Sequence, residues 1–284
     1  MGANSAARRL VKRLLYPVTN EHTYRYMQAA SKAWDIRSGK WSEPELDLIR
    51  YALLPGETAL DIGANYGLYC YHLSRRAGPA GRVYAFEPVP FTHRTLALVA
   101  KLLRLSNVEV VPKGCSDRAG RITFTVPVQA SGAIAAGLAY IGGRDDDRAG
   151  KEQQVRWAST RDVTAEVVAL DEFLPRLQNL TLVKCDVEGA ELFAFRGAER
   201  TIAGHLPSVI CEINPWYLEG FGVRLAELTD FFFSKGYELY HYANDGGRGR
   251  LRPVTPAEVG EDNYAFIHPS RRERFAEIIE GSRQ

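Results

Sequence analysis

The sequence predicts an α/β fold organised around a mostly parallel β-sheet. Short apolar runs with the length of buried strands alternate with helical segments from residue 43 onward. A glycine-containing turn follows the first of these runs, and acidic residues end several of them. With 284 residues, of which 45% are hydrophobic, the chain can bury a substantial core as one domain.

Charge and cysteine content argue against several classes of protein. The 36 Lys and Arg residues nearly balance the 34 Asp and Glu residues, so nothing indicates a nucleic-acid partner. Four widely spaced cysteines form no CxxC pair, and we expect them to be reduced and buried, which favours a cytoplasmic protein. No run approaches the ~20 apolar residues of a membrane-spanning helix. The sequence makes no prediction of the oligomeric state.

Residues 1–42 are expected to form a helical extension of the main domain, which we place at residues 43–284. Within the extension, residues 5–40 have helical character, with apolar residues on one face and basic residues opposite. One interpretation is a helix packed on the main domain. The alternative is a peripheral contact of residues 5–18 with an anionic membrane, which would give access to a lipid-linked substrate.

The first part of the main domain alternates regularly between helices and strands. Each apolar run is only four or five residues long, and a parallel sheet needs a helical crossover between such strands. We expect helices at Pro44–Leu54, Gly67–Arg76 and Phe91–Leu105, and strands at Thr58–Ile62, Arg82–Phe86 and Val108–Val111.

Residues 127–165 are expected to form an insertion in this pattern, either a lid over the sheet or a disordered loop. A strand at Arg121–Val126 precedes the insertion, whose residues Gln129–Gly150 are rich in Gly, Ala and charge. Gly246–Arg252 is expected to be a solvated hairpin turn. The other expected elements are strands at Val167–Leu170, Leu180–Cys185, Ser208–Ile213, Tyr237–Tyr242 and Tyr264–His268, and helices at Ala190–Ile202 and Leu225–Lys235, the latter closed by Gly236.

The segment LDIGANYG, residues 60–67, is the strongest indication of a ligand site. Its glycines allow a backbone to approach a ligand closely, and Glu87, 26 residues after Asp61, can accept hydrogen bonds from ribose hydroxyls. Asp61 would repel the pyrophosphate of a dinucleotide but suits the cationic S-adenosylmethionine, so we predict that cofactor. The predicted cofactor-binding residues are Asp61, Gly63, Asn65, Gly67, Glu87 and Ser116.

The chain resembles the FkbM family of S-adenosylmethionine-dependent O-methyltransferases. The stretches that carry the resemblance are LDIGANYG, VYAFEP at 83–88, VALDEFL at 168–174, KCDVEGAE at 184–191 and VICE at 209–212. The resemblance implies a Rossmann-like class I methyltransferase fold, with a seven-stranded, mostly parallel sheet and an antiparallel last strand. It also implies methyl transfer to a hydroxyl of a polyketide, a sugar or a related metabolite.

A cluster of acids follows two neighbouring strands of the predicted sheet. Asp186 and Glu212 end these strands, with Glu188 close in sequence, and all are predicted to be catalytic. Acids this close repel one another unless a cation such as Lys184 or a shared proton relieves them. In one interpretation Asp186, Glu212 and Asn214 bind Mg²⁺. In the other, which we favour, the carboxylates bind acceptor hydroxyls, and Asp186 or Glu188 is the general base with a raised pKa.

The sequence therefore predicts an O-methyltransferase acting on a hydroxyl of a small-molecule metabolite, sugar or glycan, as in natural product biosynthesis. Asn214 and Trp216, just after the second acidic strand, are predicted to bind the acceptor. An NAD-dependent oxidoreductase is the enzymatic alternative, although Asn65 stands where a GxGxxG loop has glycine. A catalytically silent S-adenosylmethionine-binding protein is the non-enzymatic alternative.

Overall fold

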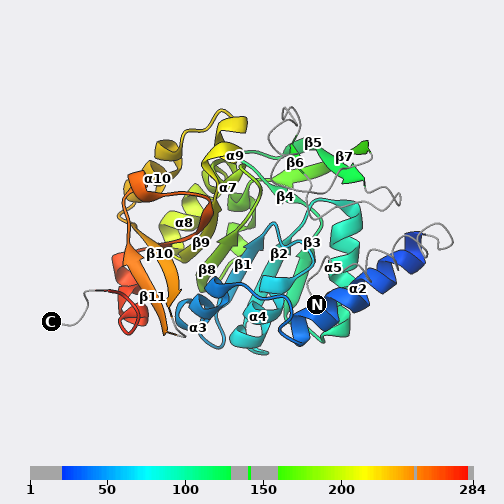
Figure 1. The fold of residues 1–284 in the computed structure, drawn as a ribbon, viewed down its shortest axis with the longest axis horizontal. Coiled ribbons are helices and arrows are strands. Elements are labelled where there is room, and N and C mark those ends of the chain that lie inside the picture. The colour runs from blue at the N-terminus through cyan, green and yellow to red at the C-terminus, as the bar shows by residue number, and fades with distance from the viewer. Residues whose placement is uncertain (1–20, 129–139, 142–158, 246–247, 281–284) are drawn as a thin grey trace.

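The computed structural model describes residues 21–128, 140–141, 159–245 and 248–280. Helices cover both faces of a twisted central sheet, and a smaller sheet stands beside one end of its strands (Figure 1). The central sheet has eight strands in the order β11-β10-β12-β9-β8-β1-β2-β3. Its strands are β1 (Thr58–Ile62), β2 (Arg82–Phe86), β3 (Val108–Val111), β8 (Leu180–Cys185), β9 (Ser208–Ile213), β10 (Glu238–Asp245), β11 (Arg248–Pro253) and β12 (Asp262–Ile267).

The strand order positions the site. From β1 the chain first builds β2 and β3 on one side and later builds β8 and β9 on the other, with all of these pairs parallel. The order therefore reverses between β1 and β8, where an open α/β sheet forms its ligand crevice. Strand β12 is antiparallel to both β9 and β10, so the expected antiparallel last strand is confirmed.

Strand β11 adds an eighth strand to the seven that were expected. The expected hairpin turn at Gly246–Arg252 is wrong for its second half, because Arg248–Pro253 pairs antiparallel with β10. Leu251 is fully buried between two exposed arginines, so the segment alternates as an edge strand does. The turn residues 246–247 lie outside the described part of the chain.

The helices are shorter and more divided than the sequence predicts. The expected helix at Ala190–Ile202 is two helices, because a Cβ at Gly197 would lie 1.9 Å from the carbonyl oxygen of Ser116, and the chain packs there backbone to backbone. The described helices are α2 (Glu21–Arg37), η2 (Pro44–Leu48), α3 (Ile49–Ala52), α4 (Leu68–Ala77), α5 (Pro90–Leu102), η4 (Leu170–Arg176), α7 (Glu191–Arg196), α8 (Glu199–His205), α9 (Pro215–Gly220), α10 (Leu225–Phe233), η5 (Pro256–Glu258) and η6 (Pro269–Phe275).

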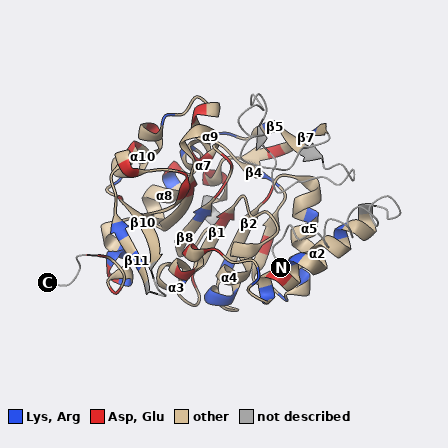
Figure 2. Ribbon diagram, viewed as in Figure 1, with Lys and Arg blue, Asp and Glu red and all other residues tan. Residues whose placement is uncertain are grey.

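The N-terminal helix α2 packs along α5 at the edge of the molecule (Figure 1). Residues 5–18, for which a membrane contact is one interpretation, lie outside the described residues. Within the described part, no helix combines the length and apolar character needed to cross a membrane. Lys and Arg residues are spread over several elements (Figure 2). The division of the chain at residue 42 stays a prediction.

A second, four-stranded sheet has the order β4-β7-β5-β6. Its strands are β4 (Gly114–Cys115), β5 (Gly120–Val128), β6 (Tyr140–Ile141) and β7 (Ser159–Val168). The expected 127–165 insertion is therefore partly sheet, because β7 already begins at Ser159 and pairs with β5 over nine residues. Residues 129–139 and 142–158 of that insertion lie outside the described part.

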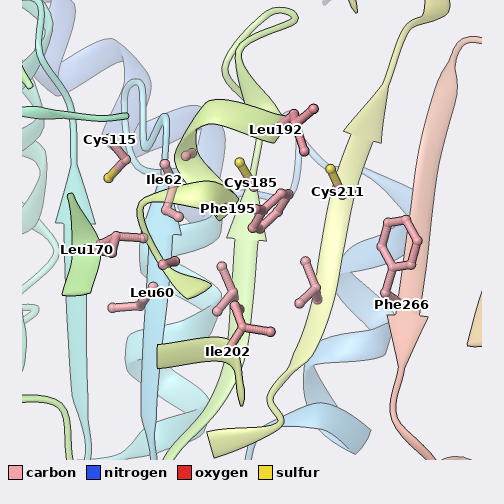
Figure 3. Close-up of a cluster of buried hydrophobic side chains, with 14 of the residues drawn as sticks. Leu60, Ile62, Cys115, Leu170, Cys185, Leu192, Phe195, Ile202, Cys211 and Phe266 are labelled. Atoms are coloured by element: carbon pink, nitrogen blue, oxygen red, sulfur yellow. The ribbon is translucent and has the colours of Figure 1, made fainter. Parts of the chain in front are cut away.

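Two buried clusters hold helices against the two faces of the central sheet. On one face Leu60 and Ile62 of β1 lie beside Phe195 of α7 and Ile202 of α8 (Figure 3). On the other face α3 and α4 cover the sheet with a separate cluster. All five residues of β1 are buried, as expected of a central parallel strand that is covered by helices on both faces. The four cysteines are free and buried.

Candidate active site

A cleft of about 170 Å³ opens at the carboxyl ends of β1, β2, β8 and β9. Residues predicted to bind the cofactor and residues predicted to act on the acceptor line this same cleft. The lining residues are Gly63, Asn65, Glu87, Pro88, Val89, Phe124, Asp186, Val187, Glu188 and Glu212. The switch in strand order thus brings together segments that are up to 149 residues apart (Gly63 to Glu212).

The turn after β1 is shaped by close backbone contact. Gly63 has φ +80°, and a Cβ there would lie 1.8 Å from the carbonyl oxygen of Asp186, so only glycine fits between β1 and β8. Asn65 has φ +48°, the left-handed conformation that Asn tolerates better than most residues. At Gly63 the turn therefore adds no side chain to the cleft, which lets a ligand approach its backbone closely.

Glu87 ties the end of β2 to this turn. Its Oε2 accepts the Asn65 N–H at 3.0 Å, and its Oε1 accepts the Val89 N–H at 2.9 Å. The residue is 6% exposed, and burial raises the pKa of Glu87 to about 7 despite these two bonds. Glu87 therefore presents a fixed, cleft-facing carboxyl where a ribose would be bound.

Three predicted cofactor residues do not line the cleft. Asp61 is 2% exposed beneath the turn, accepts the Cys70 thiol at 2.9 Å, and has its pKa raised to about 6 by burial. Gly67 has φ +90° and begins α4. Ser116 is buried and its N–H donates to Val168 in the second sheet. Their assignment to the cofactor stays a prediction.

The acids at the ends of β8 and β9 form a hydrogen-bonded pair. Asp186 and Glu212 share a side-chain hydrogen bond, which requires one proton between the two carboxyls. Burial raises the pKa of Glu212, and the bond to ionised Asp186 raises it further. Burial also disfavours ionised Asp186, but the charge of Lys184 and the hydrogen bonds from Glu212 and Lys184 together outweigh that effect and lower the pKa of Asp186, so the expectation of a raised pKa is wrong for this residue. The proton therefore resides on Glu212 and the negative charge on Asp186.

Lys184 is the cation that relieves this pair. It is 1% exposed, and its Nζ lies 3.6 Å from Asp186 Oδ2 and donates to Asn263 Oδ1 at 2.9 Å. The same ammonium lies 5.0 Å from the centre of the Tyr69 ring. Burial disfavours the charge, yet Asp186 and Glu212 hold the pKa of Lys184 above its ordinary value. The buried lysine is therefore charged.

Asn214 and Trp216 belong to the start of α9 and do not line the cleft. Asn214 is 7% exposed, and its Oδ1 accepts the N–H groups of Trp216 and Tyr217 at 3.0 and 3.3 Å. This is the geometry of a helix N-cap. The Trp216 ring packs 5.3 Å from the Tyr217 ring. Their predicted role in acceptor binding remains untested.

The donor set does not fit the Mg²⁺ interpretation. The carbonyl oxygen of the Asn214 side chain is engaged by its own helix, where it accepts two backbone N–H groups. Lys184 already supplies a positive charge beside Asp186. Among the described residues, no group of three or more His, Cys, Asp and Glu side chains is arranged to hold a metal ion.

Phe124 is a lining residue that the sequence analysis missed. It lies on β5 of the second sheet and lines the cleft together with Asp186 and Glu188. The strand itself was expected at Arg121–Val126, but nothing in the sequence indicates that it stands at the carboxyl edge of another sheet. Its place follows from Val126, fully buried against Val89 and other apolar residues of the cofactor side.

The fold and the site together define a class of protein: an S-adenosylmethionine-dependent methyltransferase with a Rossmann-like α/β fold. The chain belongs to the methyltransferase FkbM domain family, whose sequence profile matches residues 61–239, more than half of the chain. The resemblance seen in the sequence motifs is thereby confirmed. The matched range contains every residue that lines the cleft.

Individual relatives are distant. Methyltransferase 1 of Beauveria bassiana is 27% identical over 161 residues, which are 54% of this chain and 63% of that protein. Methyltransferase sdnD of Sordaria araneosa is 27% identical over 63% of this chain and 73% of its own length. The match thus spans less than two thirds of the first relative. The crystal structure of methyltransferase FkbM from Methylobacillus flagellatus KT aligns with a TM-score of 0.46 and 19% identity, over 74% of this chain and 43% of that one.

Proposed function

We propose that this protein transfers the methyl group of S-adenosylmethionine to a hydroxyl of a small-molecule metabolite, sugar or glycan. The observation that carries the proposal is the pair Asp186 and Glu212, which lines the same cleft as the cofactor turn. The buried Lys184 balances the charge of this pair. An aliphatic hydroxyl is a poor nucleophile until its proton leaves, so a base placed beside the methyl donor is what O-methylation needs.

The cofactor side of the cleft would be held by the turn at Gly63 and Asn65 and by Glu87. Glu87 would accept hydrogen bonds from ribose hydroxyls, and Gly63 would let the ligand approach the backbone. When bound, the cofactor supplies a methyl group on a sulfonium, which the acceptor oxygen displaces to leave S-adenosylhomocysteine. The chain contributes alignment and exclusion of water.

The acceptor side would handle the proton. Asp186 carries the negative charge of the acid pair, so its carboxylate would accept a hydrogen bond from the acceptor hydroxyl. As the new O–CH₃ bond forms, the hydroxyl proton passes to Asp186, and from there to solvent after product leaves. Lys184 balances the charge of Asp186 before transfer, and Glu188 would bind a second polar group of the acceptor. No divalent cation is required in this scheme.

The first test is calorimetric titration with S-adenosylhomocysteine, with Mg²⁺ and with EDTA, and the same titration with NAD. We expect S-adenosylhomocysteine to bind in both buffers with micromolar affinity, the typical range for enzyme ligands. We expect no binding of NAD. NAD binding alone would revive the oxidoreductase alternative.

Turnover is tested by S-adenosylhomocysteine formation with a panel of methyl glycosides, polyols, phenols and amines. We expect turnover with a hydroxyl compound, and loss of about 10² to 10⁴-fold in Asp186→Asn with little change in cofactor affinity. Activity with amines alone, or full activity in Asp186→Asn, would contradict the proposal. Binding without turnover on any acceptor would favour the silent binding protein.

A further inference from the structure

We propose that Glu191 is a positioning residue whose buried side chain holds the turn that carries Asp186 and Glu188 into the cleft. The inference rests on the proposed function, because that function assigns the two acids to the acceptor. Glu191 is the first residue of α7, is 2% exposed, and is not among the lining residues. It therefore acts on the site through the backbone of residues 187–189.

The contact between Glu191 and the turn consists of two hydrogen bonds to one oxygen. Its Oε1 accepts the Val187 N–H at 3.0 Å and the Gly189 N–H at 3.2 Å. These two donors flank Glu188, so the backbone folds around the carboxylate as it does around a bound anion. Burial raises the pKa of Glu191 to about 7 despite these two bonds. The turn is fixed on both sides of Glu188.

The turn needs these hydrogen bonds because its backbone conformation is unfavourable. Glu188 has φ +57°, a left-handed conformation that costs a residue with a Cβ, and Gly189 has φ +104°. A Cβ at Gly189 would lie 2.5 Å from the carbonyl oxygen of Tyr217, so the turn is also pressed against α9. Without the Glu191 oxygen, Glu188 would relax toward an ordinary conformation and leave its place on the cleft wall.

An acid that merely begins a helix would not behave this way, and the chain offers a matched comparison. Glu199 is the first residue of α8, as Glu191 is of α7. Its side chain is 64% exposed and pairs with Lys235 at 3.3 Å. Both glutamates suit the positive end of a helix dipole equally well. The bonds to the turn distinguish Glu191.

The second oxygen of Glu191 suggests a rescue variant. Oε2 is buried and accepts no hydrogen bond from the described residues. Gln keeps an oxygen in the position of Oε1 and places its NH₂ at Oε2, where no existing bond is lost. Leu fills the same space and removes the acceptor. Comparing the two separates the hydrogen bonds to the turn from packing.

The experiment compares Glu191→Leu, Glu191→Gln and Glu199→Leu with the wild type. Amide hydrogen exchange of residues 187–189 is measured first, together with S-adenosylhomocysteine affinity. Turnover is then measured with the hydroxyl acceptor that the panel identifies. We expect Glu191→Leu to lose protection of the turn amides and about 10²-fold in turnover, the effect of misplacing reacting groups by about 1 Å, with cofactor affinity unchanged. Glu191→Gln should recover most of both, and Glu199→Leu should match the wild type.

Two results would overturn the inference: turn amides that stay protected in Glu191→Leu, or a Glu191→Gln protein as impaired as Glu191→Leu. If Glu191→Leu does not fold, Glu191→Asp takes its place, because Asp keeps the carboxyl group but withdraws it by one methylene. Turn amides that stay protected in Glu191→Asp would also overturn the inference. Failure of the proposed function is distinguishable, since it would appear as no turnover with any hydroxyl compound while the exchange result stands.

Discussion

At the scale of single residues, the site combines a buried lysine with half-buried acids, and backbone contacts position them. Gly63 lets β1 touch the backbone of Asp186, so the cofactor turn and the acid pair are positioned by the same contact. Lys184 is buried without solvent, and its charge is stable only because Asp186 and Asn263 are within reach. Cofactor side and acceptor side are therefore not independent parts.

The proposed cofactor role of Glu87 predicts that the affinity for S-adenosylhomocysteine depends on pH. Burial raises its pKa to about 7 in the free protein, while a carboxylate is the better acceptor for ribose hydroxyls. We expect the affinity for S-adenosylhomocysteine to weaken as pH falls from 8 to 6, approaching about tenfold per pH unit below the pKa. Calorimetric titration at three pH values measures this. Glu87→Gln should bind weakly at every pH; an equally steep pH dependence in that variant would assign the effect to another group.

The raised pKa of Glu87 has the opposite pH dependence for folding stability. Because the pKa of Glu87 is raised above its ordinary value of 4.5, its protonated form favours the folded state. The contribution of Glu87 to stability is thus complete below pH 4.5 and is lost as pH rises through about 7. Near neutral pH the buried Glu87 carboxyl is therefore only partly ionised in the free protein.

At the scale of elements, an apolar cluster attaches strand β5 of the second sheet to the cofactor side. Val126 of β5 is fully buried in it, together with Tyr24 of α2, Tyr66 after β1, and Val89 and Phe91 at the start of α5. The cluster thus joins α2, the cofactor turn and the strand that carries Phe124. A change in this cluster is transmitted to both walls of the cleft.

Val126→Ala tests that attachment. Removing two buried methyl groups and leaving a cavity should lower the free energy of unfolding by roughly 2 kcal/mol. Since Val89 packs in the same cluster and donates to Glu87, we also expect weaker binding of S-adenosylhomocysteine. Thr123→Ala is the control, because Thr123 lies on the exposed face of the same strand. Thermal unfolding and calorimetry give both values; equal behaviour of the two variants would contradict the attachment.

The elements differ in how far the sequence predicts them. Strands β1, β8 and β9 have the predicted bounds, because a central parallel strand is a short apolar run that local pattern reveals. The acids that end β8 and β9 meet because parallel strands end at one edge. Phe124, Asn263 and the break at Gly197 could not be predicted, since each depends on a contact with a segment far away in the chain.

At the scale of the whole molecule, a buried ion pair fastens the C-terminal segment to the start of the central sheet. Arg274 in η6 donates to both oxygens of Glu57, at 2.7 and 2.9 Å, just before β1. Glu57 also accepts from Leu54 and Thr181. Burial alone would raise the pKa of Glu57, but these hydrogen bonds, with that of Arg274 the largest, lower it.

Arg274→Met should lower the free energy of unfolding by about 3 kcal/mol, because it leaves the Glu57 carboxylate partly buried without its cation. The pKa of Glu57 is lowered in the folded protein, so the stability it contributes is present above pH 4.5 and is lost as pH falls. Arg272→Met, which removes an exposed pair with Glu238 at 3.6 Å, should change stability by less than about 0.5 kcal/mol. Denaturant unfolding at pH 7 and pH 4 measures the free energy of unfolding of both variants. Equal losses of stability in Arg274→Met and Arg272→Met would contradict the stabilising role of the pair Arg274 and Glu57.

The position of Asn263 in the sequence determines when, during synthesis, Lys184 gains this hydrogen-bond acceptor. Asn263 Oδ1 accepts a hydrogen bond from the Lys184 ammonium and lies 79 residues further along the chain, on strand β12 beside β9. A ribosome adding about 5–20 residues per second needs roughly 4–16 s to cover that distance. Over the last 51 of these residues, from Glu212 to Asn263, a nascent chain already holds the cofactor turn, β8 and the acid of β9, yet the lysine lacks its amide partner. A nascent chain that ends before β12 therefore carries the chemistry of the cleft without the support that stabilises it.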